Sequence, residues 1–232
     1  MSKRERYNPP ETGEQIIARL LDSSRPVPPE YERLILAQEQ RPISPYETSD
    51  VDYSREWPRM LRGENEQNLM RAKLTGGTLV DLGGGIASHM RALAKQFEAS
   101  EYLNVDLNPS LPSDPLHSTA DEQDESVHVV QVNSDMLNFL TRMRKASAQF
   151  TINGIDELII SEPEYHQALA RELVRATKQG GLIFGTNSIV YHHLKPFIES
   201  NSPLLRKAPW KWAERDDTQL DLMGNPFIFE KI

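Results

Sequence analysis

The sequence predicts an α/β fold built on a largely parallel sheet flanked by helices. From residue 78 onward, short apolar runs alternate with segments whose apolar residues recur at helical spacing, which is typical of βαβ units. A glycine-rich stretch, Gly83-Gly84-Gly85, follows the first of these runs directly. Residues 1–76 differ, because half of the 16 prolines lie there. We therefore expect two parts, an N-terminal helical cap (1–76) and an α/β domain (77–232).

Five strands are expected to alternate with helices in the second part. They cover residues 78–82, 102–106, 127–132, 158–160 and 182–186. Near the C-terminus, residues 219–222 and 227–229 flank a Gly-Asn-Pro turn, which predicts an antiparallel hairpin at the sheet edge.

Helices are expected in both parts of the chain, from apolar residues spaced three and four apart. In the cap they cover residues 15–21, 29–40 and 64–74, and in the domain residues 90–97, 137–143 and 164–178.

Composition excludes several classes of function. The chain of 232 residues carries a net charge of −8, which disfavours broad nucleic-acid binding because phosphate contacts need clustered Lys and Arg. It has no cysteine, so disulfides and thiolate metal sites are excluded, in keeping with a cytoplasmic protein. No apolar run reaches the roughly 18 residues of a membrane helix, and no secretory signal is expected.

The segment 111–126 concentrates acidic residues. It contains five of them and no Lys or Arg, but it lacks the alternating acidic spacing and the glycine of a calcium loop. We interpret it as a solvated surface loop, and no metal site is expected in the chain.

The stretch from Asp81 to Ala87 (D-L-G-G-G-I-A) carries the main functional signal. Glycines between a strand and a helix let the backbone turn sharply and let a ligand approach the main chain. A dinucleotide-binding pattern would need a third glycine where Ser88 stands, and no Gly-Lys-Ser/Thr follows for a nucleotide triphosphate loop. The structural alternative is a tight turn without a ligand.

An acidic residue followed by G-x-G-x-(G/A) resembles motif I of the class I S-adenosylmethionine-dependent methyltransferases, with Ala87 in place of the more usual glycine. The resemblance covers the chain from about residue 78 to its end. It implies a Rossmann-like sheet of seven strands, six parallel and one antiparallel, and S-adenosyl-L-methionine as the cofactor. Gly83, Gly84 and Gly85 would give access to the backbone, and Asp81 would orient the amino-acid end of the cofactor.

Two further acidic residues end or follow strands. The resemblance implies that Asp106 accepts hydrogen bonds from the ribose hydroxyls, with Leu107 also at the cofactor. It implies that Asp135 accepts from the adenine amino group and that Met136 packs on the ring. For Asp135 a helix N-cap is a nearly equal alternative, because Ser134 and Asp135 are both favoured capping residues.

Candidates for catalysis are weak. Glu162 and His166 follow the expected fourth strand and His192 follows the fifth, where reacting groups gather in parallel sheets. Tyr165 begins an apolar helical stripe, so we expect it to be packed. The methyl acceptor is expected to be a small molecule or a protein side chain. Two alternatives stay open: an inactive cofactor-binding partner or regulatory protein, and an aminopropyltransferase.

Overall fold

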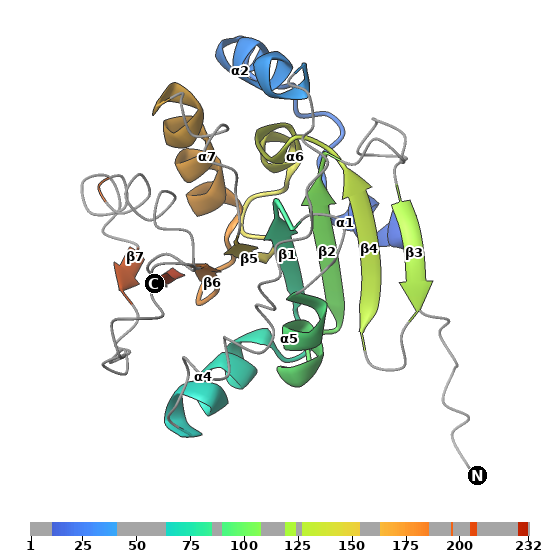
Figure 1. Ribbon diagram of the computed structural model, residues 1–232, viewed down its shortest axis with the longest axis vertical. Coiled ribbons are helices and arrows are strands. Elements are labelled where there is room, and N and C mark those ends of the chain that lie inside the picture. Colours follow the sequence, from blue (N-terminus) through green and yellow to red (C-terminus); the bar gives the residue numbers. More distant parts are fainter. Residues whose placement is uncertain are drawn as a thin grey trace, which may run out of the picture.

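The computed structural model describes residues 11–40, 64–84, 90–107, 119–123, 127–153, 163–185, 196, 205–207 and 227–231. At its centre is one sheet with the strand order β3-β4-β2-β1-β5-β6-β8-β7 (Figure 1). The strands are β1 (Thr78–Leu82), β2 (Glu101–Asp106), β3 (Thr119–Gln123), β4 (His128–Asn133), β5 (Gln149–Ile152), β6 (Leu182–Gly185), β7 (Leu205–Lys207) and β8 (Phe227–Lys231).

Most of the sheet is parallel. Strands β4, β2, β1, β5 and β6 share one direction, whereas β3 and β8 run antiparallel to their neighbours. Strand β7 is antiparallel to β8 and therefore shares the direction of the parallel set. The expected α/β class is confirmed, but the expected seven strands with one antiparallel are wrong. The described residues form eight strands, two of them antiparallel.

The additional strand, β3, comes from the acidic segment 111–126. It pairs with β4 over five residues, from Thr119 opposite Val132 to Gln123 opposite His128. Acidic residues are depleted in strands, so the sequence favoured a loop there. The backbone pairing with β4, which composition does not record, makes this part of the segment an edge strand.

Two other strands lie where the sequence predicted none, β5 at Gln149–Ile152 and β7 at Leu205–Lys207. Strand β5 pairs with β1 on the side away from β2. The expected fourth strand, 158–160, lies outside the described residues. Strand β8 lies between β6 and β7, so the C-terminal strand is not the sheet edge. The expected partner strand at 219–222 is also outside the described residues.

Helices cover both faces of the sheet. On one face, α1 (Gly13–Leu20), α2 (Pro29–Glu39), α6 (Met136–Arg142) and α7 (Pro163–Ala176) share a core with Val80 of β1. On the other face, α4 (Glu64–Leu74) and α5 (Met90–Gln96) share a core with Leu79. Adjacent residues of β1 enter different cores because successive strand side chains point to opposite faces.

The N-terminal helices belong to these same cores. Helix α1 begins with a capping box, in which the Thr12 hydroxyl accepts from Gln15 N and the Gln15 side chain accepts from Thr12 N at 2.8 Å. Its apolar stripe of Ile16, Ile17 and Leu20 is buried. The described helices of segment 1–76 thus pack directly around the sheet. The domain boundary at residue 76 stays a prediction.

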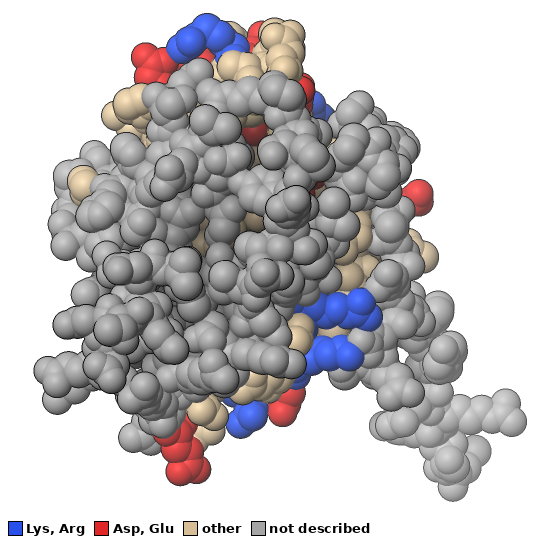
Figure 2. Space-filling model, in the orientation of Figure 1, with Lys and Arg blue, Asp and Glu red and all other residues tan. Residues whose placement is uncertain are grey.

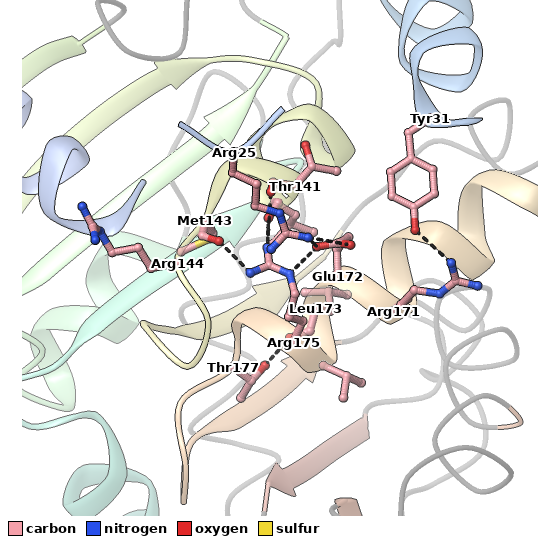
Figure 3. A network of polar contacts seen from close by, with 12 residues as sticks. Arg25, Tyr31, Thr141, Met143, Arg144, Arg171, Glu172, Leu173, Arg175 and Thr177 are labelled. Atoms are coloured by element: carbon pink, nitrogen blue, oxygen red, sulfur yellow. Dashed lines mark hydrogen bonds and ion pairs between the residues drawn. The ribbon is translucent and has the colours of Figure 1, made fainter. Parts of the chain in front are cut away.

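A polar network fastens α7 to its neighbours (Figure 3). Glu172, whose side chain is 4% exposed, accepts from Arg175 Nε at 2.5 Å and from Arg25 at 3.3 Å. The Arg175 guanidinium also donates to the carbonyl oxygens of Leu140 and Met143 at 2.6 and 2.7 Å. Both carbonyls lie at the C-terminal end of α6, where Leu140 O also accepts from Met143 N at 3.1 Å. Arg175 therefore helps to cap this end of the helix.

Within the described part of the chain, no helix has both the length and the apolar character needed to cross a membrane.

Candidate functional site

The glycine turn lies at the carboxyl end of β1. Gly83 has a φ of +73°, a conformation that favours glycine, and its N–H donates to Val105 O of β2 at 2.9 Å. A Cβ on Gly84 would lie 2.6 Å from Asp81 Oδ2 and closer still to Asn104 Oδ1. The turn therefore presses directly onto two polar side chains of the sheet. Gly85 and the rest of the motif lie outside the described residues.

Asp81 lies beneath this turn and is buried, with 1% of the residue exposed. Its Oδ2 accepts a hydrogen bond from Tyr102 OH at 2.6 Å, whereas its Oδ1 has no hydrogen-bond partner among the described residues. Burial raises the pKa of Asp81 to about 7; the Tyr102 hydrogen bond opposes this rise and the nearby charge of Asp106 adds to it. The site thus holds a buried acceptor oxygen that still needs a donor.

A row of polar side chains continues from Asp81 across the sheet. Asp81 pairs in register with Asn104 of β2 and with Thr151 of β5. The Asn104 amide donates to Gln131 of β4 at 2.8 Å, and Asn153 donates to Thr151 Oγ1 at 2.7 Å. Sequence reasoning missed this row. The signal was the alternation in β2 and β5, where a polar residue recurs at every second position toward the strand end.

Asp106 is the last residue of β2 and is half-buried, as is Leu107 after it. It pairs in register with Asn133 at the end of β4, and its carbonyl oxygen accepts from Ser134 N at 3.1 Å. Since Asp106 acts electrostatically on Asp81, the two carboxyls lie near each other at one edge of the sheet. Its ribose-binding role stays a prediction.

Asp135 is the N-cap of α6, so this alternative is confirmed. Its Oδ1 accepts from Asn138 N at 2.9 Å and its Oδ2 from Tyr165 OH at 2.8 Å. Burial raises its pKa to about 7, against the lowering effect of these hydrogen bonds. Met136, in the first turn of α6, is buried. Contacts of Asp135 and Met136 with adenine stay predictions.

Of the three catalytic candidates, only His166 lies in the described part of the chain; Glu162 and His192 do not. His166 is on the buried side of α7, 4% exposed, with its ring edge-on to Tyr165 at 6.1 Å. Tyr165 is fully buried, as expected. No group of three possible metal ligands occurs among the described residues.

The described candidates therefore all lie along the carboxyl edge of the parallel strands. Asp81, Gly83 and Gly84 come from the end of β1, Asp106 from the end of β2, and Asp135 from the residue pair that follows β4. In Figure 1 this edge is marked by the arrowheads of β1, β2 and β4, with α6 and α2 beside it. Ligands of open parallel sheets bind at this edge.

Comparisons with known proteins are distant. No family model and no curated protein matches the chain. A Streptococcus mutans protein crystallised with SAH shares 11% identity at a TM-score of 0.47, covering 73% of this chain and 97% of that one. An rRNA methylase from Streptococcus thermophilus shares 11% identity at a TM-score of 0.44, covering 72% and 95%. Precorrin-6y C5,15-methyltransferase from Geobacter metallireducens shares 13% identity at 0.42, covering 75% and 92%. Likeness at this level says nothing of activity.

Proposed function

We propose that the chain is a cytoplasmic S-adenosylmethionine-dependent methyltransferase whose acceptor is a small molecule or a protein side chain. The observation that carries this proposal is the buried Asp81 Oδ1, which has no partner among the described residues and lies beneath a glycine turn. A buried acceptor of this kind costs free energy unless a ligand or an ordered water donates to it.

The charges at this edge favour a cationic ligand. Asp81 and Asp106 are close enough for one to raise the pKa of the other, so a positive group between them lowers their mutual repulsion. S-Adenosylmethionine carries both an ammonium and a sulfonium. When bound, it supplies the methyl group that is transferred.

The chain's own residues would bind and orient this cofactor. The Asp81 carboxylate would accept from its amino group, directly or through a water, and the Asp106 carboxylate would accept from its ribose hydroxyls, since a carboxylate offers acceptors and no donor. The turn at Gly83 and Gly84 would let it approach the backbone.

The charge pattern of the surface supports an acceptor other than nucleic acid. On the face shown in Figure 2, the described Lys and Arg atoms lie in separate small groups, some of them with acidic atoms nearby. Nucleic-acid binding calls for a continuous basic patch, and the described residues on this face form none.

Calorimetry with S-adenosylmethionine, S-adenosylhomocysteine and the decarboxylated donor tests the proposal. We expect binding of the first two, and Asp106→Ala should weaken it by about 1.5–3 kcal/mol, the range for hydrogen bonds to a charged group. Glu30→Ala, at an exposed carboxylate in the first turn of α2, should leave affinity unchanged. If the wild type bound neither ligand, or if Asp106→Ala bound them as tightly as the wild type, this site would be excluded. Preference for the decarboxylated donor would favour an aminopropyltransferase. Binding of the donor without turnover on a panel of substrates would favour a regulatory protein.

A further inference from the structure

The apolar stripe of α2 ends in a buried amide. Tyr31, Leu34 and Ile35 face the core, and the next residue on this face is Gln38, which is 3% exposed. Neither Gln38 Oε1 nor Gln38 Nε2 has a hydrogen-bond partner among the described residues. Buried side-chain amides nearly always have partners, so an unpartnered one needs an explanation.

A second buried glutamine shows what a satisfied amide looks like in this protein. Gln149, at the start of β5, is fully buried. Its Nε2 donates to Lys73 O at 2.6 Å and its Oε1 accepts from Leu182 N at 3.2 Å. Gln149 therefore joins β5 to α4 and β6. In the part of the chain that is described, the Gln38 amide joins no two elements by hydrogen bonds.

The last turn of α2 lies at the carboxyl edge of the sheet. Glu39 Oε1, next to Gln38, accepts from the Asn138 amide in the first turn of α6 at 3.5 Å. Its negative charge also helps to raise the pKa of Asp135, the N-cap of α6. Figure 1 shows α2 beyond the arrowheads of β1, β2 and β4, beside α6.

A continuous series of contacts joins Asp106 to the last turn of α2. Asp106 pairs with Asn133, and Ser134 N donates to Asp106 O. Asp135 then caps α6, against which the end of α2 packs. A nucleoside held through its ribose at Asp106 would thus extend its base toward α6 and α2.

Helix α2 is fixed in place along its length. Tyr31 OH accepts from Arg171 of α7 at 3.2 Å (Figure 3). Arg33 pairs with Glu164 in the first turn of α7 at 2.6 Å. The amide of Gln38 is therefore presented by a docked helix, which limits the entropy lost when it binds a ligand.

We propose that Gln38 is a specificity-determining residue that binds the adenine base of the nucleoside. This inference rests on the proposed function. A primary amide offers an adjacent donor and acceptor, and glutamine forms paired hydrogen bonds with the matching acceptor and amino group of adenine. Helix α2 would then complete the binding site.

The test replaces each buried glutamine by methionine, which has a similar shape and no amide. Gln38→Met should raise the Tm of the free protein, because an unpartnered amide is removed. It should also weaken S-adenosylhomocysteine binding roughly tenfold, the loss expected for a paired contact with a base. Gln149→Met should do the reverse: a lower Tm, because Leu182 N and Lys73 O lose their partners, and an unchanged affinity.

A ligand without the amino group identifies the contact. The analogue of S-adenosylhomocysteine that carries purine in place of adenine should bind the wild type more weakly than S-adenosylhomocysteine itself. In Gln38→Met the preference for S-adenosylhomocysteine over the purine analogue should shrink. Unchanged affinity in Gln38→Met, or an undiminished preference for adenine, would overturn the role of Gln38 alone. A wild type that binds neither ligand would overturn the proposed function as well.

Discussion

Two pairs of buried polar side chains, one pair at each edge of the sheet, differ in how they are satisfied. At the amino edge, both polar atoms of the Gln149 amide are hydrogen-bonded, and the Lys231 ammonium donates to Val174 O and Thr177 O at the end of α7 at 2.9 and 2.8 Å. At the carboxyl edge, one carboxylate oxygen of Asp81 and both polar atoms of the Gln38 amide have no hydrogen-bond partner among the residues described.

This difference separates stability from function within one sheet. A satisfied buried group contributes to folding, whereas an unsatisfied one costs free energy until something binds it. The carboxyl edge carries that cost beside the glycine turn. We therefore expect substitutions at the amino edge to change stability alone, and substitutions at the carboxyl edge to change ligand binding.

The largest effect is expected at Glu172, in the satisfied network. Glu172→Gln leaves Arg175 and Arg25 without their buried anion, and removing one partner of a buried pair costs about 3 kcal/mol. Urea unfolding measures the loss. Glu164→Gln is the control, because its pair with Arg33 is about 70% exposed on both sides and should contribute under about 0.5 kcal/mol. Equal losses in the two variants would contradict this account of the network.

A smaller loss of stability, with a loss of binding, is expected at Gly84. In Gly84→Ala the new methyl group meets Asp81 and Asn104, and such overpacking costs about 1–3 kcal/mol. Because the turn must move, S-adenosylhomocysteine affinity should fall as well. Gly76→Ala is the control: nothing lies within 4 Å of its Cβ, and its φ of +64° costs about 1–2 kcal/mol. Equal affinities of Gly84→Ala and the wild type for S-adenosylhomocysteine would show that the glycine turn is not part of the ligand site.

Local patterns predicted much of the fold. Helical spacing placed α1, α2, α4, α5, α6 and α7 close to their observed bounds, and the apolar runs placed β1, β2, β4 and β6. Sequence could not place β3, β5 or β7 (Leu205–Lys207). The acidic strand β3 exists through its pairing with β4, and β5 alternates polar and apolar residues over only four positions.

Sequence predicted the parts of the candidate site that follow from local backbone features. It missed the parts that follow from packing between elements distant in sequence. The glycine pattern and the acidic residue ending β2 are local features, and the structure places Asp81 and Asp106 near the carboxyl ends of neighbouring strands. Gln38 looked like the end of an ordinary amphipathic helix. Its significance comes from contacts between α2 and α6, which are distant in sequence.

Titration of Asp81 links the stability of the folded protein to ligand binding. Because burial raises its pKa to about 7, the folded protein keeps this carboxyl protonated at pH values where the unfolded chain ionises. Its stabilising contribution is complete below the ordinary pKa of 3.8 and is lost as pH rises through about 7. The ligand amino group needs the ionised carboxylate, so binding should strengthen over the interval in which this stability is lost.

Calorimetric titration with S-adenosylhomocysteine between pH 5.5 and 7.5 tests this claim most directly. Wild-type affinity should rise by up to roughly tenfold per pH unit and level off near pH 7, as Asp81 ionises. Asp81→Asn should bind more weakly and show little of this rise. A wild-type affinity that does not change with pH, or the same rise in Asp81→Asn, would contradict the assignment of the ligand to Asp81.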